Sequence, residues 1–520
     1  MSEPLLLAID QGTQSVRAML FDVHGELVAK SQVHIEPYFS RQPGWAEQEC
    51  DYFWDNLSQA CQALWRDHAD LKPRVVAAAL TTQRASVVCL DADHRPLRPA
   101  VIWLDQRRTS NFPVLPPWLS LPIKALGQGG TMAQFQSKAE CNWLAADEPE
   151  TWAKTAHFVL LSGYLTWKLT GTLCDAIPSQ VGYLPFDFKG QQWAGPLDMK
   201  WRALTVKRKQ LPPLVPAGEQ LGSVSAEAAA ATGIPEGLPL FSAGADKACE
   251  VLASGALTPS TGNLSYGTTA TFNTCNSKYV EPMPFVPPYP ASVPGHYNSE
   301  IIVQRGYWMV NWFKREFAAA EVLKAEQQGI EPEVLFEQLL AESPPGAMGL
   351  TLQPFWNPGV KVPGPEAKGA IIGFGDVHTR AHLYRAIIEG IGYALREGKE
   401  RLEKRNGVPV QTLTVSGGGS QSDAIMQITA NIFGLPARRP HTFETSGLGA
   451  AINAAVGAGL YDNHAQAVAA MTRPGDVFEP DPATAELYDQ LYRQVYRPLY
   501  GRLAPLYRSI RHITGYPARY

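Results

Sequence analysis

Residues 5–22 read LLLAIDQGTQSVRAMLFD, which is two apolar, β-prone runs on either side of the polar turn QGTQ. The turn VHGE and a third β-prone run, LVAKSQV at residues 27–33, follow directly. Runs of this kind that alternate with short turn signals are typical of antiparallel strands joined by hairpins. The segment therefore predicts a three-stranded meander at the start of the fold.

Helical and strand patterns alternate through much of the remaining chain. Residues 51–70 place apolar side chains on one helical face and lead into the apolar run VVAAAL at 75–80. The clearest helical pattern spans about 379–404, with Thr379 as its expected N-cap. A short strand, the loop SGGGSQSD and a helix at about 423–433 follow. Helices that feed buried strands indicate an α/β fold.

The composition is that of an ordinary globular protein. The chain has 520 residues, 45 of them basic and 49 acidic, with a formal net charge of −4. This length suits two or three domains, because single cores rarely exceed about 250–300 residues.

Without a basic patch, no nucleic-acid partner is expected. No apolar run approaches the roughly 18 residues of a membrane span, so we expect no membrane association and a cytoplasmic location. The seven cysteines include no C-x-x-C pair, which favours reduced core residues over a disulfide framework.

The turn at residues 10–15 carries groups that suit a phosphate and a metal ion. Its glycine lets the backbone approach a ligand closely, its hydroxyl and N–H groups can donate to phosphate, and its carboxylate can hold a hydrated metal. A plain hairpin turn held by side-chain hydrogen bonds explains the same residues equally well. The candidate residues are Asp10, Gly12, Thr13, Gln14 and Ser15.

Two later glycine-containing segments offer related chemistry. Residues 267–269 lie in NLSYGTTATFNTC, where G-T-T echoes the G-T-Q of the first turn. Residues 267–269 alone read as a turn. Together with the first turn, about half a chain earlier, they suit a nucleoside triphosphate clamped between two similar lobes. Residues 417–419 lie between a strand and a helix, where a base or ribose can lie flat against the backbone; a flexible connection is the alternative. The candidate residues are Gly267, Thr268, Thr269, Gly417, Gly418 and Gly419.

Asp246 follows an apolar strand and is surrounded by small residues in AGADKA. A carboxylate with this much room can face a cleft and accept a proton from an attacking hydroxyl. An ordinary helix N-cap is an equally good interpretation of the same residue. The neighbouring Lys247 either points elsewhere or holds Asp246 ionised.

Arg84 follows the strand-like run LTTQ, and Trp103 and Asp105 come some twenty residues later. An arginine, an acid and an aromatic plane suit hydrogen bonding and apolar stacking on a polyol. Ion pairing at the surface and packing in the core explain these residues just as well.

Taken together, these segments resemble the FGGY carbohydrate kinases, within the actin, sugar kinase and Hsp70 superfamily. The likeness covers nearly the whole chain, and its segments follow one another in the family's order. They are DQGTQSVRAMLFD, TTQRASVV with PAVIWLDQRRT, WLAADEPETW, YLTWKLTG, GSVSAEAAAATGIPEGLPLFSAGADKA, LSYGTTATF, HTRAHLYRAIIEGIGYALR and VSGGGSQSDAIMQITANIFG.

The resemblance implies two lobes of ribonuclease-H-like fold, an N-terminal domain at 1–255 and a C-terminal domain at 256–520, with ATP and Mg²⁺ in the cleft between them. It implies an ATP-dependent kinase acting on a hydroxyl of a small sugar or polyol, of the xylulose or ribulose type or another polyol rather than glycerol. It leaves a homodimer open. The alternative is an actin-like ATPase of the same superfold that acts in assembly or sensing without a sugar acceptor.

The resemblance also implies roles for individual residues. Asp10 matches the metal-associated carboxylate and Asp246 the general base, while the turns at 10–15 and 267–269 match the phosphate loops and Gly418 and Gly419 the adenosine motif. The sugar pocket is matched by Arg84, Trp103, Phe135 and Asp246.

Three positions depart from the family's wording. Glycerol kinases carry an acid directly after the matching arginine, but Ala85 stands here, which removes an acceptor for a polyol hydroxyl and disfavours glycerol. Glu140 lies where the signature K-x-x-W-L has its lysine, and Lys247 replaces the usual amide or small residue after the base.

Overall fold

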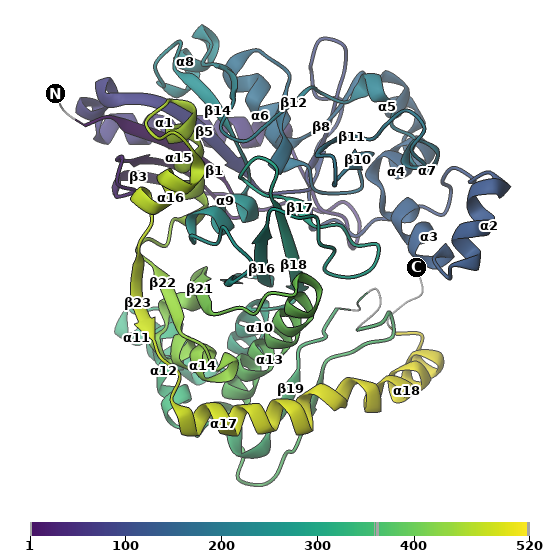
Figure 1. The fold of residues 1–520 in the computed structure, drawn as a ribbon, viewed down its shortest axis with the longest axis vertical. Coiled ribbons are helices and arrows are strands. Elements are labelled where there is room, and N and C mark those ends of the chain that lie inside the picture. Colours follow the sequence, from purple (N-terminus) through teal and green to yellow (C-terminus); the bar gives the residue numbers. More distant parts are fainter. Residues whose placement is uncertain (1–2, 358, 360–362, 517–520) are drawn as a thin grey trace.

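Two lobes, each built on a mixed β-sheet, make up the protein in a computed structural model that describes residues 3–357, 359 and 363–516. The N-terminal half forms the upper lobe of Figure 1 and most of the C-terminal half forms the lower one. Residues 1–2 and 517–520, the outer ends of the two expected domains, lie outside the described residues.

The upper lobe contains a six-stranded sheet in the order β13-β14-β5-β1-β2-β3. The expected meander is confirmed, since β1, β2 and β3 pair antiparallel. Strand β5 then pairs parallel to β1, and β14 pairs parallel to β5. All seven residues of β1 are buried, so both faces of this sheet are covered. The bounds are β1 Leu5–Gln11, β2 Ser15–Phe21, β3 Leu27–His34, β5 Val75–Thr82, β13 Gln220–Ser223 and β14 Pro239–Ala245.

The lower lobe repeats this arrangement in the seven-stranded sheet β17-β18-β16-β15-β21-β22-β23. Strands β15, β16 and β18 form an antiparallel meander, β21 and β22 add in parallel, and β23 closes the edge antiparallel, as β13 does above. Apart from the additional edge strand β17, the two sheets have the same strand order, and the G-T-Q and G-T-T turns lie in equivalent hairpins. The bounds are β15 Thr261–Tyr266, β16 Ala270–Asn276, β17 Tyr289–Pro290, β18 Tyr297–Val303, β21 Thr412–Ser416, β22 Ala437–Pro440 and β23 Pro474–Phe478.

Helices cover the faces of both sheets. Helix α1 (Cys50–Asp67) packs on β2 and β3, and α13 (Arg380–Asn406) packs on β16 and β18. Both helices were expected, and Thr379 is the N-cap of α13 as its sequence predicts. A Cβ at Gly390 would lie 2.4 Å from the carbonyl oxygen of Leu352, so this helix needs glycine where it approaches the neighbouring backbone. Helix α14 (Asp423–Phe433) follows the glycine-rich loop as expected.

Two helices connect the lobes. Helix α9 (Asp246–Ala253) begins where β14 ends and packs against α15 (Thr445–Gly457). A Cβ at Gly449 of α15 would lie 2.0 Å from the carbonyl oxygen of Cys249, so the two backbones are in direct contact. Although α15 comes late in the chain, it packs on β1, β5 and β14 of the upper sheet, beside α16 (His464–Met471) (Figure 1). The boundary between residues 255 and 256 stays a prediction.

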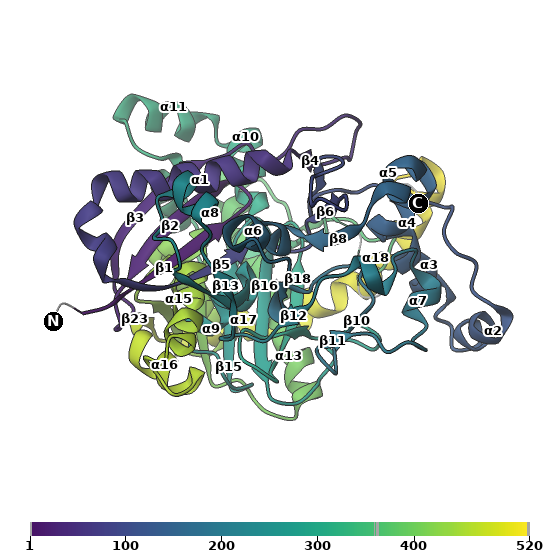
Figure 2. The same cartoon turned by 90° about the horizontal axis from the view of Figure 1, so that it is seen from above.

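The remaining elements form the sides of the two lobes. A second sheet of the upper lobe, β4-β7-β6-β8, lies beside helices α4 and α5, away from β1 to β3, as Figure 2 shows from above. Described helices include none that is both long and apolar enough to cross a bilayer. All seven cysteines are buried and unpaired. The other bounds are β4 Glu47–Gln48, β6 Val87–Leu90, β7 Ala100–Val101, β8 His157–Leu160, β9 Asp175–Ala176, β10 Phe186–Asp187, β11 Gln192–Trp193, β12 Leu214–Val215, β19 Thr351–Gln353, β20 Ala370–Ile372, α2 Pro117–Ala125, α3 Gly129–Lys138, α4 Glu140–Asp147, α5 Pro149–Lys154, α6 Leu161–Thr170, α7 Lys200–Ala203, α8 Ala226–Thr232, α10 Trp308–Phe317, α11 Ala319–Gln328, α12 Pro332–Ala341, α17 Pro482–Leu491 and α18 Arg497–Thr514.

Candidate active site

The hairpin between β1 and β2 leaves polar groups available to a ligand. The N–H of Gly12 donates to the carbonyl of Ser15 at 3.0 Å and closes the turn. The N–H groups of Thr13 and Gln14 form no hydrogen bond within the part of the chain that the structure describes. Consecutive free N–H groups in a tight turn make a concave site for an anion such as phosphate.

Asp10 lies at the end of β1 and is almost fully buried. Its Oδ2 accepts a hydrogen bond from Arg17 at 3.2 Å, whereas Oδ1 has no hydrogen-bond partner. Burial raises the pKa of Asp10 to about 7, with smaller contributions from the charges of Asp246 and Glu444, while Arg17 opposes the shift. A buried carboxylate oxygen without a partner fits a hydrated cation, because the positive charge of the cation would compensate the negative charge of the carboxylate.

The second hairpin, between β15 and β16, has the same character. The carbonyls of Gly267 and Thr268 accept from the N–H groups of Tyr307 and Trp308 at 3.1 and 3.2 Å, which ties the turn to the start of α10. The N–H groups of Thr268 and Thr269 donate to no other described residue. The two turns therefore share both a similar sequence and two consecutive backbone N–H groups that are free to donate.

The glycine-rich loop lies directly against this second hairpin. Gly417 has a φ of 85°, and a Cβ there would lie 2.8 Å from the backbone of Tyr266. A Cβ at Gly419 would lie 2.4 Å from the ring of Tyr307. At Gly418, by contrast, a Cβ would meet no atom within 4 Å. The loop is thus packed at two glycines and open at the middle one, which fits a flat group lying over Gly418.

Asp246 is the first residue of α9 and is half-buried. The N-cap of this helix is Ala245, so capping is not the role of Asp246. Its Oδ1 accepts from the backbone N–H of Lys247 at 2.7 Å. Burial raises the pKa of Asp246 above its ordinary value, and the charges of Lys247 and Arg84 oppose the shift. Asp10 lies at the end of β1, Arg84 follows the end of β5 and Asp246 follows the end of β14; because these neighbouring strands are parallel, the three residues share one edge of the sheet.

Lys247 connects this site to the lower lobe. Its Nζ lies 2.7 Å from Oε2 of Glu250 and donates to the hydroxyl of Ser265 on β15, two residues before the second hairpin. Glu250 in turn accepts from the hydroxyl of Ser416, at the end of β21. Burial alone would raise the pKa of Glu250, but Lys247 and the hydroxyls hold it below its ordinary value. A buried ion pair on α9 is therefore hydrogen-bonded to two strands of the other lobe.

Arg84 forms a second contact between the lobes. Its guanidinium donates to Oε1 of Glu300 on β18 at 2.8 Å and lies over the ring of Tyr289, 5.4 Å from the centroid. A small pocket of about 10 Å³, enough for one water molecule or one hydroxyl group, lies beside this pair. Its lining comes from both lobes and comprises Arg84, Pro178, Val181, Ala245, Lys247, Ala248, Asn273, Tyr289, Pro290, Asn298 and Glu300.

Trp103 connects the first hairpin to the Arg84 side of the site. Its indole N–H donates to the hydroxyl of Thr13 at 3.0 Å, and that hydroxyl donates to Gln83, next to Arg84, at 3.0 Å. Trp103 is 37 % exposed, an unusual exposure for so large an apolar side chain.

Phe135 lies on α3 and meets Tyr183 edge to face, with ring centroids 5.7 Å apart. Glu140 begins α4, and burial raises its pKa to about 7, with Asp105 adding to the shift and Arg107 and Lys138 opposing it. Phe135 is not among the residues that line the pocket beside Arg84, so its role as a wall of the sugar pocket stays a prediction.

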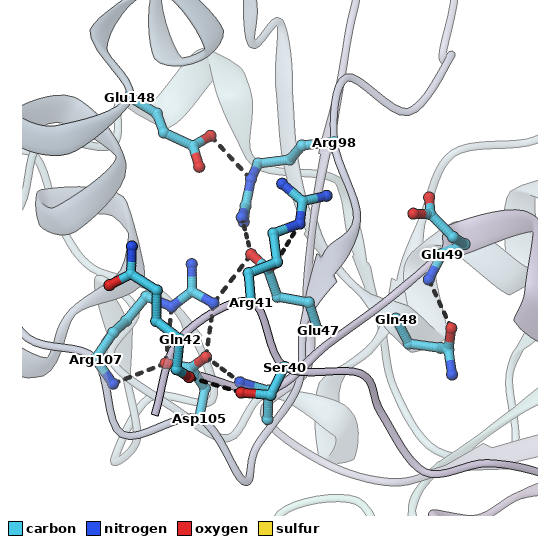
Figure 3. Close-up of polar contacts among 11 residues, drawn as sticks. Ser40, Arg41, Gln42, Glu47, Gln48, Glu49, Arg98, Asp105, Arg107 and Glu148 are labelled. Carbon is cyan, nitrogen blue, oxygen red and sulfur yellow. Dashed lines mark hydrogen bonds and ion pairs between the residues drawn. The ribbon is translucent and has the colours of Figure 1, made fainter. Parts of the chain in front are cut away.

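Asp105 does not have free oxygens for a ligand. Figure 3 shows its carboxylate facing Arg107, which donates to both oxygens at 2.8 and 2.7 Å, and the N–H of Ala46 donates to Oδ2. Arg107 also lies 3.0 Å from Glu47, which pairs with Arg98 as well. Asp105 is therefore part of a structural network of charges.

The structure brings most sequence-derived candidates together. Asp10, Arg84, Trp103 and Asp246 share one region with the two hairpins, while the glycine loop borders the second hairpin. Within residues 3–357, 359 and 363–516, no group of three or more His, Cys, Asp or Glu side chains forms a preassembled metal site. Sequence reasoning missed Glu300, which has no local signature, and Glu250, whose spacing of three from Lys247 on a helix was a readable signal.

Comparisons with known proteins agree with this arrangement. The family profiles for the N-terminal and C-terminal domains of the FGGY family of carbohydrate kinases match residues 5–253 and 262–458. The uncharacterized sugar kinase YgcE of Escherichia coli is 30 % identical, over 94 % of this chain and 92 % of its own. The xylulose kinase of Lactococcus lactis is 27 % identical, over 94 % of both chains. The crystal structure of xylulose kinase from Rhodospirillum rubrum superposes with a TM-score of 0.81 at 27 % identity, covering 97 % of this chain and 100 % of that one.

The two matched regions together take in both lobes, including the hairpins, Asp246 and the glycine loop. They also favour a kinase over an actin-like ATPase without a sugar acceptor. The chain belongs to the FGGY family of carbohydrate kinases and is an ATP-dependent sugar phosphotransferase.

Proposed function

We propose that this kinase transfers the γ-phosphoryl group of MgATP to a hydroxyl of a small ketose or sugar alcohol, of the xylulose or ribulose type or another polyol rather than glycerol. The observation that carries the proposal is the place of Asp246. Asp10, Arg84 and Asp246 lie at or just beyond the carboxyl ends of the adjacent parallel strands β1, β5 and β14. Ala245, directly before Asp246, lines the pocket beside Arg84.

The polar groups of the site match the needs of phosphoryl transfer. The free N–H groups of the two hairpins hold the phosphates, and the open face of Gly418 receives the adenosine. Asp10, with its unpartnered Oδ1, would hold the Mg²⁺ ion. When bound, this ion supplies positive charge that neutralises the phosphate oxygens.

Asp246 acts as the general base. As the acceptor oxygen forms its bond to the γ-phosphorus, the hydroxyl proton passes to the carboxylate of Asp246, and the bond from the γ-phosphorus to the bridging oxygen breaks to release ADP. A pKa raised by burial moves the carboxylate towards the range in which it accepts a proton readily at neutral pH. Arg84 orients the acceptor, and the face of Trp103 packs against its carbon chain.

A coupled assay of ADP release, run across C3 to C6 polyols, ketoses and aldoses, tests the proposal. We expect release to depend on one acceptor class and one mole of phosphorylated acceptor to form per mole of ADP. Equal ADP release with and without every acceptor would refute it.

A cytoplasmic location and a homodimer stay predictions. Analytical ultracentrifugation with and without ATP separates a small oligomer from an assembling filament.

A further inference from the structure

The pocket beside Arg84 has a wall that belongs to the opposite lobe. Asn298 and Glu300 lie two residues apart on β18, so their side chains are on the same face of the strand, and both line the pocket. The side chain of Glu300 is 2 % exposed. Asn298 is also buried, and its Oδ1 has no hydrogen-bond partner. A buried amide oxygen that lines a pocket without a partner is costly unless a ligand or water donates to it.

Glu300 takes the place of a carboxylate that the local sequence lacks. Ala85, directly after Arg84, cannot accept a hydrogen bond through its side chain. In the folded protein the carboxylate of Glu300 lies 2.8 Å from the Arg84 guanidinium, although the two residues are 216 positions apart. The folded protein therefore does have a carboxylate beside this arginine, but the lower lobe supplies it.

The charges of this pocket balance one another. Arg84 is paired with Glu300, and Lys247 is paired with Glu250. Each of these two cations is already neutralised by a neighbouring carboxylate, so the pocket offers an anionic ligand no net positive charge. The carboxylate of Glu300 would repel such a ligand. Neutral hydroxyl groups, which can donate to Glu300 and Asn298 and accept from Arg84, fit the same groups well.

We propose that Glu300 is an acceptor-binding and specificity-determining residue, and that the subsite formed by Arg84, Asn298 and Glu300 takes one neutral hydroxyl group of a sugar or polyol and rejects a carboxylate. This inference rests on the proposed kinase function and adds the class of acceptor. Because Arg84 and Glu300 belong to different lobes, an acceptor held by both binds most tightly when the lobes are closed.

The test compares wild-type enzyme with Glu300→Gln and Glu300→Asp across neutral polyols and ketoses and the corresponding aldonates, such as gluconate. The full chain is used with saturating MgATP. The matched control is Glu333→Gln, because Glu333 forms an exposed ion pair with Lys314 on the outside of the lower lobe. Thermal unfolding of each variant verifies that it is folded.

We expect wild-type enzyme to prefer a neutral acceptor. Glu300→Gln lowers kcat/KM for that acceptor about tenfold or more, through KM, and leaves the KM for ATP unchanged, since a charge-assisted hydrogen bond is lost. Glu300→Gln also lowers the ratio of kcat/KM for the neutral acceptor to kcat/KM for the aldonate, whereas Glu300→Asp and Glu333→Gln keep the ratio of the wild type. A wild-type preference for aldonates would overturn the inference.

The two proposals fail in different ways. Acceptor-dependent ADP release that Glu300→Gln leaves within twofold of wild type refutes the role of Glu300 alone. Release that no acceptor stimulates removes the proposed kinase function, and the role of Glu300 with it. If Glu300→Gln does not fold, Asn298→Ala takes its place, and an unchanged acceptor KM in that variant overturns the subsite.

Discussion

The Nζ of Lys247 lies 2.7 Å from Oε2 of Glu250, one turn further along the helix that begins with Asp246. The same ammonium donates to Ser265 in the lower lobe, and Glu250 accepts from Ser416 there. The candidate base is therefore adjacent to a buried ion pair whose hydrogen bonds extend into the other lobe. This relationship gives Lys247, an unusual residue after the base in this family, a physical role.

Removing that ion pair should shift the pH dependence of catalysis. Lys247 lowers the pKa of Asp246 more than Glu250 raises it, so the double variant Lys247→Met, Glu250→Gln should have a base with a higher pKa. A base with a higher pKa stays protonated to higher pH, so the acidic limb of the kcat/KM profile moves to higher pH. Lys247→Arg is the control. An unmoved limb would show that Lys247 does not act on the base.

Asp246→Asn should lower kcat at least about a hundredfold, because an amide cannot accept the hydroxyl proton. The KM for ATP should stay near that of wild type, since no phosphate contact is assigned to this side chain. Steady-state kinetics with the best acceptor measure both values. Turnover at the wild-type rate would mean that another group is the base.

Asp10→Asn should inactivate the enzyme and, at alkaline pH, stabilise it. The folded protein binds the Asp10 proton more tightly than the unfolded chain does, because its pKa is raised to about 7. The contribution of Asp10 to folding is thus most favourable below its ordinary pKa and is lost as the pH rises through about 7. At pH 8 the amide should add about 2–4 kcal/mol to the free energy of unfolding, and about half of that or less at pH 5. Denaturant unfolding at both pH values decides; a variant equally destabilised at both would contradict the buried charge.

Substitutions at two neighbouring glycines should have different effects, one on ATP binding and the other on the stability of the fold. Gly418→Leu adds a side chain in open space, so the fold should persist while the KM for ATP rises about tenfold or more. Gly417→Ala places a Cβ against Tyr266 at a φ of 85° and should cost about 1–3 kcal/mol of stability. Unfolding curves and ATP titrations of the pair test this. Wild-type ATP affinity in Gly418→Leu would place the adenosine elsewhere.

Local patterns were enough to predict the parts of the fold whose causes are local. The meander at 5–33, the helix from Arg380 and the helix after the glycine loop follow from turn residues, capping and apolar spacing, and the structure has them. The resemblance supplied the two-lobed fold and the kinase reaction. Asp10 was identifiable because it stands in a tight turn with groups that suit phosphate, and Arg84 because it follows a strand-like run and precedes an aromatic residue and an acid that suit a polyol.

Contacts between distant segments could not be predicted in this way. Glu300 sits in a strand with no unusual spacing, and only folding brings it to Arg84. The carboxylate of Asp105 looked available in the sequence, but Arg107 occupies both of its oxygens. Both outcomes depend on which side chains meet in space, and single-sequence periodicity does not contain that information.

Helix α15 has a consequence for how this chain is made. It completes the core of a sheet that begins at residue 5, yet about 190 residues separate it from α9, the helix it packs on. A ribosome adding roughly 5–20 residues per second needs about ten to forty seconds to synthesise that interval. During translation, the part of the apolar sheet face that α15 covers therefore stays exposed beside α9 until this interval has been synthesised.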